Sequence, residues 1–262
     1  MHFYKYQGTG NDFIIFDNRN KDIIFSAENI QFICDRRFGI GADGLMLLQL
    51  IEGFDFEMKY YNCDGIEATM CGNGGRCMVN FAASLGIITH SCKFSASDGI
   101  HEAEIIGKNV KLGMSDILNI EKIDNDYYLD TGNPHYVRFC NNIDLVDIIE
   151  ESRKIRYDQR FQPTGTNVNY VELKQEKLFV RTYEKGVENE TLSCGTGVVA
   201  AAIASSEVNN SIRNFTEITT PGGKLNVYFN KNASGYNNIY LEGNAVFVFE
   251  GEITRSILDR TY

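Results

Sequence analysis

The hydrophobic pattern predicts a helix in the middle of the first half of the chain. Cys77, Phe81 and Leu85 recur at every fourth residue, which is the spacing of one helix face. Four small residues at positions 72–75 come just before this pattern, and Cys71 precedes them. The sequence therefore predicts a thiol at the N-terminal end of a central helix.

Apolar runs on both sides of this helix predict strands. Alternation is clearest in residues 54–62, where every second residue from Phe54 to Tyr60 is apolar. The predicted strands are two runs within residues 3–17, separated by a turn at residues 8–12, and residues 45–51, 54–62, 92–97 and 100–106. Residues 29–38 predict a short helix closed by Gly39.

The second half repeats this arrangement. Residues 191–197 are another run of small residues that opens a helix over 198–207, and Cys194 follows Cys71 by 123 positions (194 − 71). The same offset pairs Gly72 with Gly195 and Gly74 with Gly197, and nearby segments match at offsets of 122 (Asn133 − Asn11) and 124 (Gly223 − Gly99). A domain-sized internal repeat predicts two copies of one unit, each with many short strands around one central helix.

We therefore expect two pseudo-symmetric domains. The first takes residues 1–115 together with 248–262 and carries Cys71, and the second takes residues 116–247 and carries Cys194. Two copies of one fold commonly pack about a pseudo-twofold axis. Such an axis would bring the two cysteines to opposite sides of one cleft.

Composition narrows the class of protein and of partner. A formal charge of −10 over 262 residues argues against nucleic acid and anionic membrane, since both require a basic surface. The most apolar run, residues 198–204, is too short to span a bilayer, and the start of the chain lacks the pattern of a secretory signal. An odd number of cysteines, seven, predicts no disulfide framework and fits a reducing, cytoplasmic location.

The two thiols have a setting that favours acid–base chemistry. The N-terminus of a helix lowers the pKa of a thiol, and its N–H groups can hold a carboxylate beside the sulfur. Inverting a stereocentre by proton transfer requires one group to remove a proton and a second to deliver one to the opposite face. No lysine stands in a recognisable pyridoxal-phosphate context, so we expect no cofactor.

A series of motifs, in order and over nearly the whole chain, resembles the diaminopimelate epimerase family. These motifs are residues 8–13 (GTGNDF), 38–44 (FGIGADG), 61–65 (YNCDG), 70–74 (MCGNG), 132–135 (GNPH), 166–169 (TNVN), 183–186 (YEKG) and 190–197 (ETLSCGTG). The resemblance implies a fold of the α/β (α+β) class, in which each of two alike halves is a curved, mostly antiparallel sheet or barrel around its central helix.

The resemblance also implies an activity and a site. The enzyme would interconvert LL- and meso-diaminopimelate for lysine and peptidoglycan synthesis without a cofactor or metal, as a homodimer, with Cys71 and Cys194 as the acid/base pair. His135 would support the reaction by orienting the ammonium group or tuning a thiol. By position, the residues holding the substrate would be Asn11, Asn62, Gly72, Asn73, Asn133, Asn167, Glu184, Lys185, Gly195 and Thr196.

Three positions depart from the family's pattern. Lys185 stands where an arginine is expected, and it offers a point charge instead of a planar fork for a carboxylate. Gly44 replaces a glutamine found in some members, and Tyr136 replaces a frequent cysteine. These departures concern recognition of the far end of the substrate more than the reaction.

Other readings of the same residues predict different functions. A related racemase of proline-like substrates would be expected to carry histidine where this chain has Asn73. A Cys–His hydrolase using one thiol and His135 leaves the second cysteine and the repeat without a role. A non-catalytic thiol protein would tolerate loss of both cysteines. A dinucleotide site at residues 195–200 (GTGVVA) lacks the preceding strand and the ribose-binding acid.

The remaining cysteines have less specific contexts. Cys34, Cys92 and Cys140 lie in apolar or strand-like segments and are expected in the core, as is Cys77 in its helix. Cys63, Cys71, Cys77 and His90 lack the paired spacing of a zinc site, and Cys63 has no predicted role.

Overall fold

The computed structural model describes residues 1–209 and 214–254, which form parts of two compact units. Unit 1 takes Met1–Leu112 and Asn244–Tyr262, and unit 2 takes Gly113–Gly243. The boundaries expected from the sequence lie three residues later at the first crossing (115 − 112) and four residues later at the second (247 − 243). In the described residues, no helix combines the length and apolar character that a membrane span requires.

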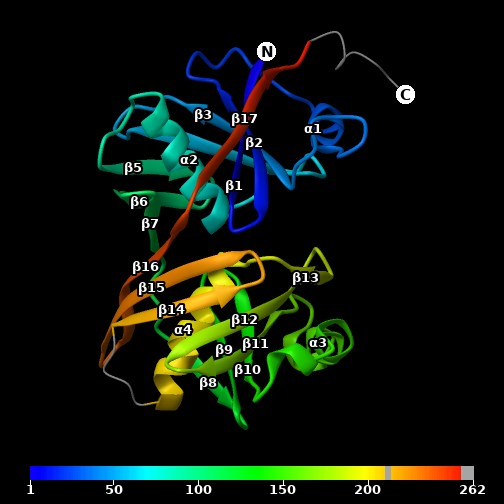
Figure 1. The fold of residues 1–262 in the computed structure, drawn as a ribbon, viewed down its shortest axis with the longest axis vertical. Helices are drawn as coiled ribbons and strands as arrows, with labels where there is room; N and C mark the ends of the chain where they lie inside the picture. The colour runs from blue at the N-terminus through cyan, green and yellow to red at the C-terminus, as the bar shows by residue number, and fades with distance from the viewer. Residues whose placement is uncertain (210–213, 255–262) are drawn as a thin grey trace. The chain divides into compact units, whose positions relative to one another are not determined.

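Unit 1 is a curved sheet in which strands are paired in the order β17-β1-β2-β3-β4-β5-β6-β7 (Figure 1). The pairs β2/β3 and β4/β5 are parallel, and the other five are antiparallel. The strands are β1 (His2–Gly8), β2 (Asn11–Asp17), β3 (Gly44–Gln49), β4 (Phe56–Asn62), β5 (Ser91–Ala96), β6 (Gly99–Ile106), β7 (Asn109–Met114) and β17 (Val246–Glu252), with helices α1 (Ala27–Cys34) and α2 (Gly72–Ser84).

Unit 2 repeats this order with β8-β9-β10-β11-β12-β14-β15-β16, and the short strand β13 pairs with β12. The parallel pairs β10/β11 and β12/β14 occupy the same places as those of unit 1, so the duplication read from the sequence is confirmed. The strands are β8 (Ile120–Ile123), β9 (Asp126–Asp130), β10 (Pro134–Phe139), β11 (Asn167–Lys174), β12 (Lys177–Glu184), β13 (Asn189–Thr191), β14 (Phe215–Thr220), β15 (Gly223–Asn232) and β16 (Gly235–Asn244). The helices are α3 (Ile148–Arg156) and α4 (Gly195–Asn209), with 3₁₀ turns η1 (Ile143–Leu145) and η2 (Gln159–Phe161).

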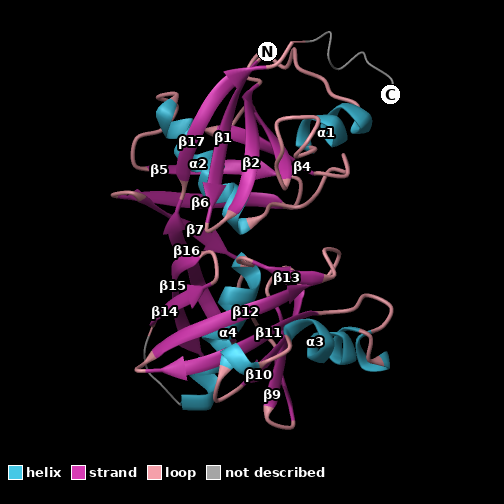
Figure 2. Cartoon of the chain, turned by 45° about the vertical axis from the view of Figure 1, so that its right-hand side comes forward, coloured by secondary structure: helices cyan, strands magenta, loops and turns pink. Residues whose placement is uncertain are grey.

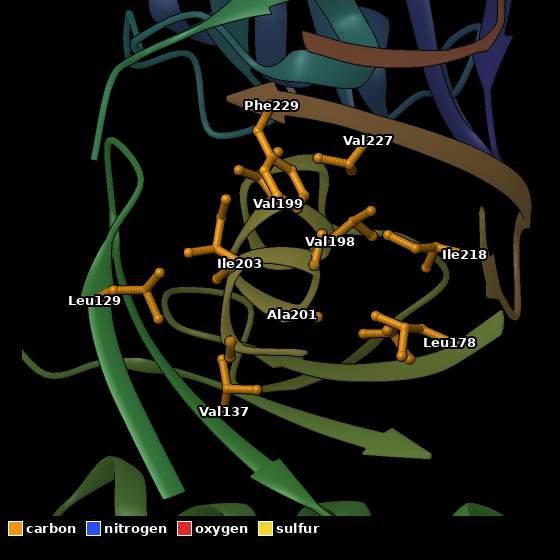
Figure 3. Close-up of a cluster of buried hydrophobic side chains, with 14 of the residues drawn as sticks. Leu129, Val137, Leu178, Val198, Val199, Ala201, Ile203, Ile218, Val227 and Phe229 are labelled. Atoms are coloured by element: carbon orange, nitrogen blue, oxygen red, sulfur yellow. The ribbon is translucent and has the colours of Figure 1, made fainter. Parts of the chain in front are cut away.

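Each unit closes around its own central helix (Figure 2). Helix α2 buries ten of its thirteen residues and contacts β1, β2, β3, β4, β6 and β17. The run of apolar residues 198–204 in α4 is entirely buried, because strands β9, β10, β11, β12, β14 and β15 all contact this helix. Figure 3 shows this core, in which Val199 and Ile203 of α4 lie among side chains such as Leu129 and Phe229.

The first helix differs from the prediction over residues 29–38. It begins earlier because Ser26 caps it: the Ser26 hydroxyl accepts from the Asn29 N–H, and the Asn29 side chain accepts from the Ser26 N–H. It ends at Cys34 because Asp35 takes an extended conformation and its carboxylate accepts the N–H of Arg37 and of Phe38, each at 2.7 Å. Helix α3 is absent from the elements predicted above.

Candidate active site

Cys71 lies at the N-terminal end of α2, as the sequence predicts. It is the N-cap residue, with an extended backbone, and its carbonyl oxygen accepts the Gly75 N–H at 2.7 Å. Its side chain is half-buried, and its Sγ donates to Asn11 Oδ1 at 3.5 Å. The thiol therefore stands at the positive end of the helix dipole, where a bound anion or thiolate is stabilised.

Two hydrogen-bonded amides, those of Asn11 and Asn73, lie beside Cys71. Asn11 Nδ2 donates to Asp43 Oδ2 at 2.7 Å, which leaves Asn11 Oδ1 turned toward the thiol. The same oxygen accepts from Asn73 Nδ2 at 3.3 Å. Asn11 Oδ1 is therefore a fixed hydrogen-bond acceptor for the Cys71 thiol, and it pairs with the protonated form of Cys71.

A buried guanidinium supports this pair of amides. Arg76 is fully buried, and its Nη2 donates to Asn73 Oδ1 at 2.8 Å while Nη1 donates to the Gly72 carbonyl at 3.2 Å. Its Nε donates to the Asn244 carbonyl at 3.4 Å, so each of these acceptors is neutral. Burial lowers the pKa of Arg76, and the thiols of Cys77 and Cys71 act against that shift.

An ion-pair network underlies the loop that carries Asn11. Arg36 bridges Asp12 at 2.6 Å and Asp43 at 2.8 Å, and Lys5 pairs with Asp12 at 2.7 Å. Burial alone would raise the pKa of Asp12, but the hydrogen bonds and charges of Arg36 and Lys5 outweigh it and lower that pKa to about 2. The network keeps the Asp43 carboxylate where it fixes the Asn11 amide.

Cys194 occupies the corresponding place in unit 2. It is buried, it directly precedes α4, and its carbonyl oxygen accepts the Val198 N–H at 2.9 Å. Its Sγ lies 3.4 Å from the Thr196 hydroxyl oxygen. Gly195 begins the helix, so this thiol also stands at the N-terminal end of a central helix.

His135 lies buried in β10 and contacts the same hydroxyl. Its Nε2 is 2.9 Å from Thr196 Oγ1, and its Nδ1 is 3.0 Å from Asn169 Nδ2. Burial lowers the pKa of His135 to about 3, and the charge of Lys185 adds to that shift. The imidazole is therefore neutral at neutral pH.

The other predicted site residues lie at the ends of strands. Asn167 begins β11; its Oδ1 accepts the Lys185 N–H at 2.8 Å, and its Nδ2 donates to the Pro134 carbonyl at 3.2 Å. Glu184 is the last residue of β12, and Asn133 is half-buried in the loop between β9 and β10. In unit 1, Asn62 ends β4 and accepts from the Tyr60 hydroxyl at 2.8 Å.

The predicted site residues thus gather within each unit. Unit 1 joins Cys71, Asn11 and Asn73 in one hydrogen-bonded group, and unit 2 joins Cys194, Thr196 and His135 in another. The sequence predicts no role for Arg76, Asp43 or Asn169, which hold these groups in place. Each of these three residues lies in or next to one of the motifs named above, but the sequence does not show which other side chains it contacts.

The remaining thiols differ from these two. Cys34, Cys77 and Cys92 are buried, and burial raises the pKa of each to about 12. Cys140, which was expected in the core, is only half-buried because it lies just beyond the end of β10. Cys63 is exposed. Within residues 1–209 and 214–254, no cluster of three or more histidine, cysteine, aspartate or glutamate side chains has the arrangement of a metal site.

Comparison with known proteins gives one consistent result. The family model described as diaminopimelate epimerase matches residues 3–117 and 127–248. The diaminopimelate epimerase of Flavobacterium psychrophilum is 49% identical over 97% of this chain and 100% of its own length. That of Chlorobaculum tepidum is 42% identical over 94% and 99%.

Solved structures share the fold at low identity. A phenazine biosynthesis protein of the PhzF family from Bacillus anthracis superposes with a TM-score of 0.75 at 16% identity, covering 97% of this chain and 99% of that one. A hydroxyproline epimerase from Agrobacterium vitis gives a TM-score of 0.71 at 12% identity, covering 97% and 90%. The predicted fold class is confirmed.

Proposed function

The chain belongs to the diaminopimelate epimerase family, and from this premise we propose that it interconverts LL- and meso-diaminopimelate by proton transfer between two thiols. The observation that carries the proposal is the pair of cysteines, Cys71 and Cys194, each at the N-terminal end of the central helix of its own unit. A single-thiol hydrolase has no use for the second of these positions.

In the proposed reaction the thiolate of one cysteine removes the proton from the α-carbon. The electron pair of the broken C–H bond moves toward the neighbouring carboxylate, where N–H groups of the two helix ends stabilise the developing charge. The thiol of the other cysteine then delivers its proton to the opposite face of the carbon. The two sulfur atoms exchange protonation states and no electrons are gained or lost, so the reaction requires no redox cofactor.

The proposal assigns substrate contacts to the amide-rich loops around both thiols. Asn11 and Asn73 beside Cys71, and Asn167 and Thr196 near Cys194, offer donors and acceptors for carboxylate and ammonium groups. The remaining proposed contacts are Asn62, Gly72, Asn133, Glu184, Lys185 and Gly195, of which Glu184 and Lys185 supply charge.

We also propose a homodimer that acts in the cytoplasm. Strand β17 supports the dimer: Val246, Phe247, Val248 and Phe249 expose between 38% and 51% of their surface. Four consecutive exposed apolar residues are unusual on a monomer surface and are typical of an interface. Sedimentation of the purified protein tests this, because Phe247→Lys is expected to shift it toward the monomer.

Incubation with LL-diaminopimelate in D₂O, without added cofactor, tests the reaction. The expected result is meso product with deuterium at one α-carbon only. Cys71→Ala and Cys194→Ala are each expected to abolish epimerisation, whereas Cys63→Ala, which replaces an exposed thiol, should not. Full rates in both of the first two variants would exclude the two-thiol mechanism, and exchange into proline-type substrates instead would redirect the substrate assignment.

A further inference from the structure

A buried polar cluster in unit 2 goes beyond what the two-thiol reaction requires. His135 of β10, Asn169 of β11 and Thr182 of β12 are almost completely inaccessible to solvent, and Asn169 hydrogen-bonds to both of the others. His135 continues the cluster to Thr196 on α4. Burial of polar groups costs stability unless every group is paired, so a cluster in the core calls for an explanation.

Two of the equivalent places in unit 1, those of His135 and Asn169, are apolar. The parallel pair β2/β3 sets Ile15 opposite Met46, and β10/β11 sets Val137 opposite Asn169, at repeat offsets of 122 and 123. By the same register, Phe13 corresponds to His135. The same fold therefore accommodates Phe13 and Met46 in unit 1 and a histidine and an asparagine at the equivalent positions of unit 2.

The central helices confirm that these positions are equivalent. A β-carbon added at Gly74 of α2 would lie 3.2 Å from Met46 Sδ and 3.5 Å from Phe13 Cε1. A β-carbon at Gly197 of α4 would collide with Asn169 Oδ1 and lie 3.3 Å from His135 Cε1. The polar cluster thus lies against Gly197, in the first turn of α4 and one turn from the Cys194 thiol.

Hydrogen bonds fix the orientation of the Asn169 amide. Its Oδ1 accepts from the Thr182 hydroxyl at 2.9 Å, and its Nδ2 donates to the Tyr136 carbonyl at 3.1 Å. The group that faces His135 Nδ1 at 3.0 Å is therefore an N–H donor. A donor requires an unprotonated nitrogen, so Nδ1 of this imidazole is the acceptor.

The neutral imidazole then carries its single proton on Nε2. This N–H points at Thr196 Oγ1, 2.9 Å away, and makes that oxygen an acceptor. Asn167 Nδ2 is also 3.5 Å from Nε2, but it donates to the Pro134 carbonyl at the shorter distance of 3.2 Å. The Thr196 hydroxyl proton is left to point away from His135, and Cys194 Sγ lies 3.4 Å from the hydroxyl oxygen.

We propose that Asn169 is a positioning residue of this reaction: it holds His135 in the Nε2–H form and thereby turns the Thr196 hydroxyl proton toward the Cys194 sulfur. This inference rests on the proposed function, in which Cys194 acts as a thiolate. A hydrogen bond to the charged form of a group favours that form, so the chain of three donors prepares Cys194 as a base. Beside Cys71, by contrast, Asn11 Oδ1 can only accept.

Nitrogen NMR of the free enzyme labelled with ¹⁵N-histidine tests the first step directly. The chain has four histidines, and the spectrum of His135→Gln identifies the signals of His135. The expected result is a protonated Nε2 and an unprotonated Nδ1 near neutral pH. The opposite tautomer would overturn the proposal, because Nε2 would then accept the Thr196 hydroxyl proton itself.

Asn169→Leu tests the role of the amide by the same spectrum. Without a donor at Nδ1, the imidazole is expected to populate both neutral forms. A variant that folds and keeps only the Nε2–H form would refute the assignment of Asn169. If this variant does not fold, the wild-type spectrum and the two Thr196 variants described next still test the proposal.

The pH dependence of Cys194 alkylation by iodoacetamide, under reductant and read by peptide mass spectrometry, tests the last step. Thr196→Val removes the hydroxyl at nearly constant volume and is expected to slow alkylation about tenfold at pH 7. Thr196→Ser keeps the hydroxyl and should stay near the wild-type profile. Glu184 and Lys185, the charged groups at the end of β12, are present in every variant, so their fields do not distinguish the profiles.

Neither measurement needs turnover, so failure of the substrate assignment and failure of this inference are distinguishable. Equal Cys194 alkylation in Thr196→Val and wild type at every pH would refute the hydroxyl contact. Alkylation of Cys71, in the other unit, is the internal control and is expected to change little.

Discussion

Acid destabilises this protein through His135, and the size of the effect follows from its burial. The pKa of this imidazole falls to about 3 in the folded protein because burial disfavours the charged form. In the unfolded chain it returns to about 6.5. Below pH 6.5 the unfolded state therefore binds a proton that the folded state does not, and stability falls as pH decreases from 6.5 toward 3.

The magnitude is about 1.4 kcal/mol for each pH unit in that window, or about 2 kcal/mol between pH 6.5 and pH 5. His135→Gln removes the titration and keeps a polar side chain. The variant is expected to be less stable than wild type at pH 7, because the hydrogen bonds to Asn169 and Thr196 are altered. That difference should shrink by about 2 kcal/mol by pH 5.

Urea unfolding at fixed protein concentration, repeated between pH 7.5 and pH 5, measures this difference. All other titrating groups are shared by the two proteins, so they cancel in it. His90→Gln, which replaces an exposed histidine, is the matched control and should run parallel to wild type. If the His135→Gln and wild-type curves also run parallel, the imidazole is not held neutral by burial and the reasoning is wrong.

Four further predictions concern other parts of the site. Gly197→Ala should destabilise the protein by about 1–3 kcal/mol, because the new β-carbon collides with the Asn169 amide. Gly74→Ala should destabilise it less, because its new β-carbon meets flexible methionine side chains. Thermal unfolding of the two variants and the wild type measures both effects. Asp12→Asn should lower the free energy of unfolding by about 2 kcal/mol at pH 7, since this carboxylate has a pKa of about 2 in the folded protein. The stabilisation by the carboxylate is present above pH 4 and is lost as pH falls toward 2. Urea unfolding of the variant and the wild type across that pH range measures it. Lys185→Arg should lower the KM for diaminopimelate severalfold by offering a forked donor to a carboxylate, and an unchanged or higher KM would place this residue away from the substrate. If Cys71 and Cys194 act on one substrate as proposed, mild oxidation should inactivate the enzyme by joining them, with recovery on reduction. A peptide map of the inactivated enzyme without this cross-link would contradict the prediction.

Much of the fold could be predicted because hydrophobic periodicity and an internal repeat are both visible in the order of residues along the chain. The period of Cys77, Phe81 and Leu85 predicts the central helix, and the offset of 123 residues from Cys71 to Cys194 predicts its duplicate. The range predicted for the first helix is wrong because the helix begins at the Ser26 capping box and ends where the Asp35 side chain accepts N–H groups. Both are hydrogen-bonding events that hydrophobic periodicity does not report.

The supports of the two thiols could not be predicted in the same way. Asn169 and Thr182 lie on different strands, and only their pairing across β11 and β12 brings the hydroxyl to the amide. Arg76 lies within the cysteine motif, but a surface arginine and a fully buried one look identical in sequence. Long-range register decides such contacts, and a single sequence contains no direct measure of register.

The duplication explains why two thiols occupy equivalent places, but not why their surroundings differ. In unit 1 a buried guanidinium, Arg76, anchors the amides beside Cys71, and the repeat offset of 123 places the apolar Val199 at the matching position of unit 2. Unit 2 instead relies on neutral donors that start at Asn169 and end at Thr196. In the proposed reaction the two thiols exchange roles when the direction is reversed, so each sulfur requires its place at a helix end but not the same neighbours. Both units place their sulfur at the start of the central helix, and they differ in the buried residues that orient the groups around it.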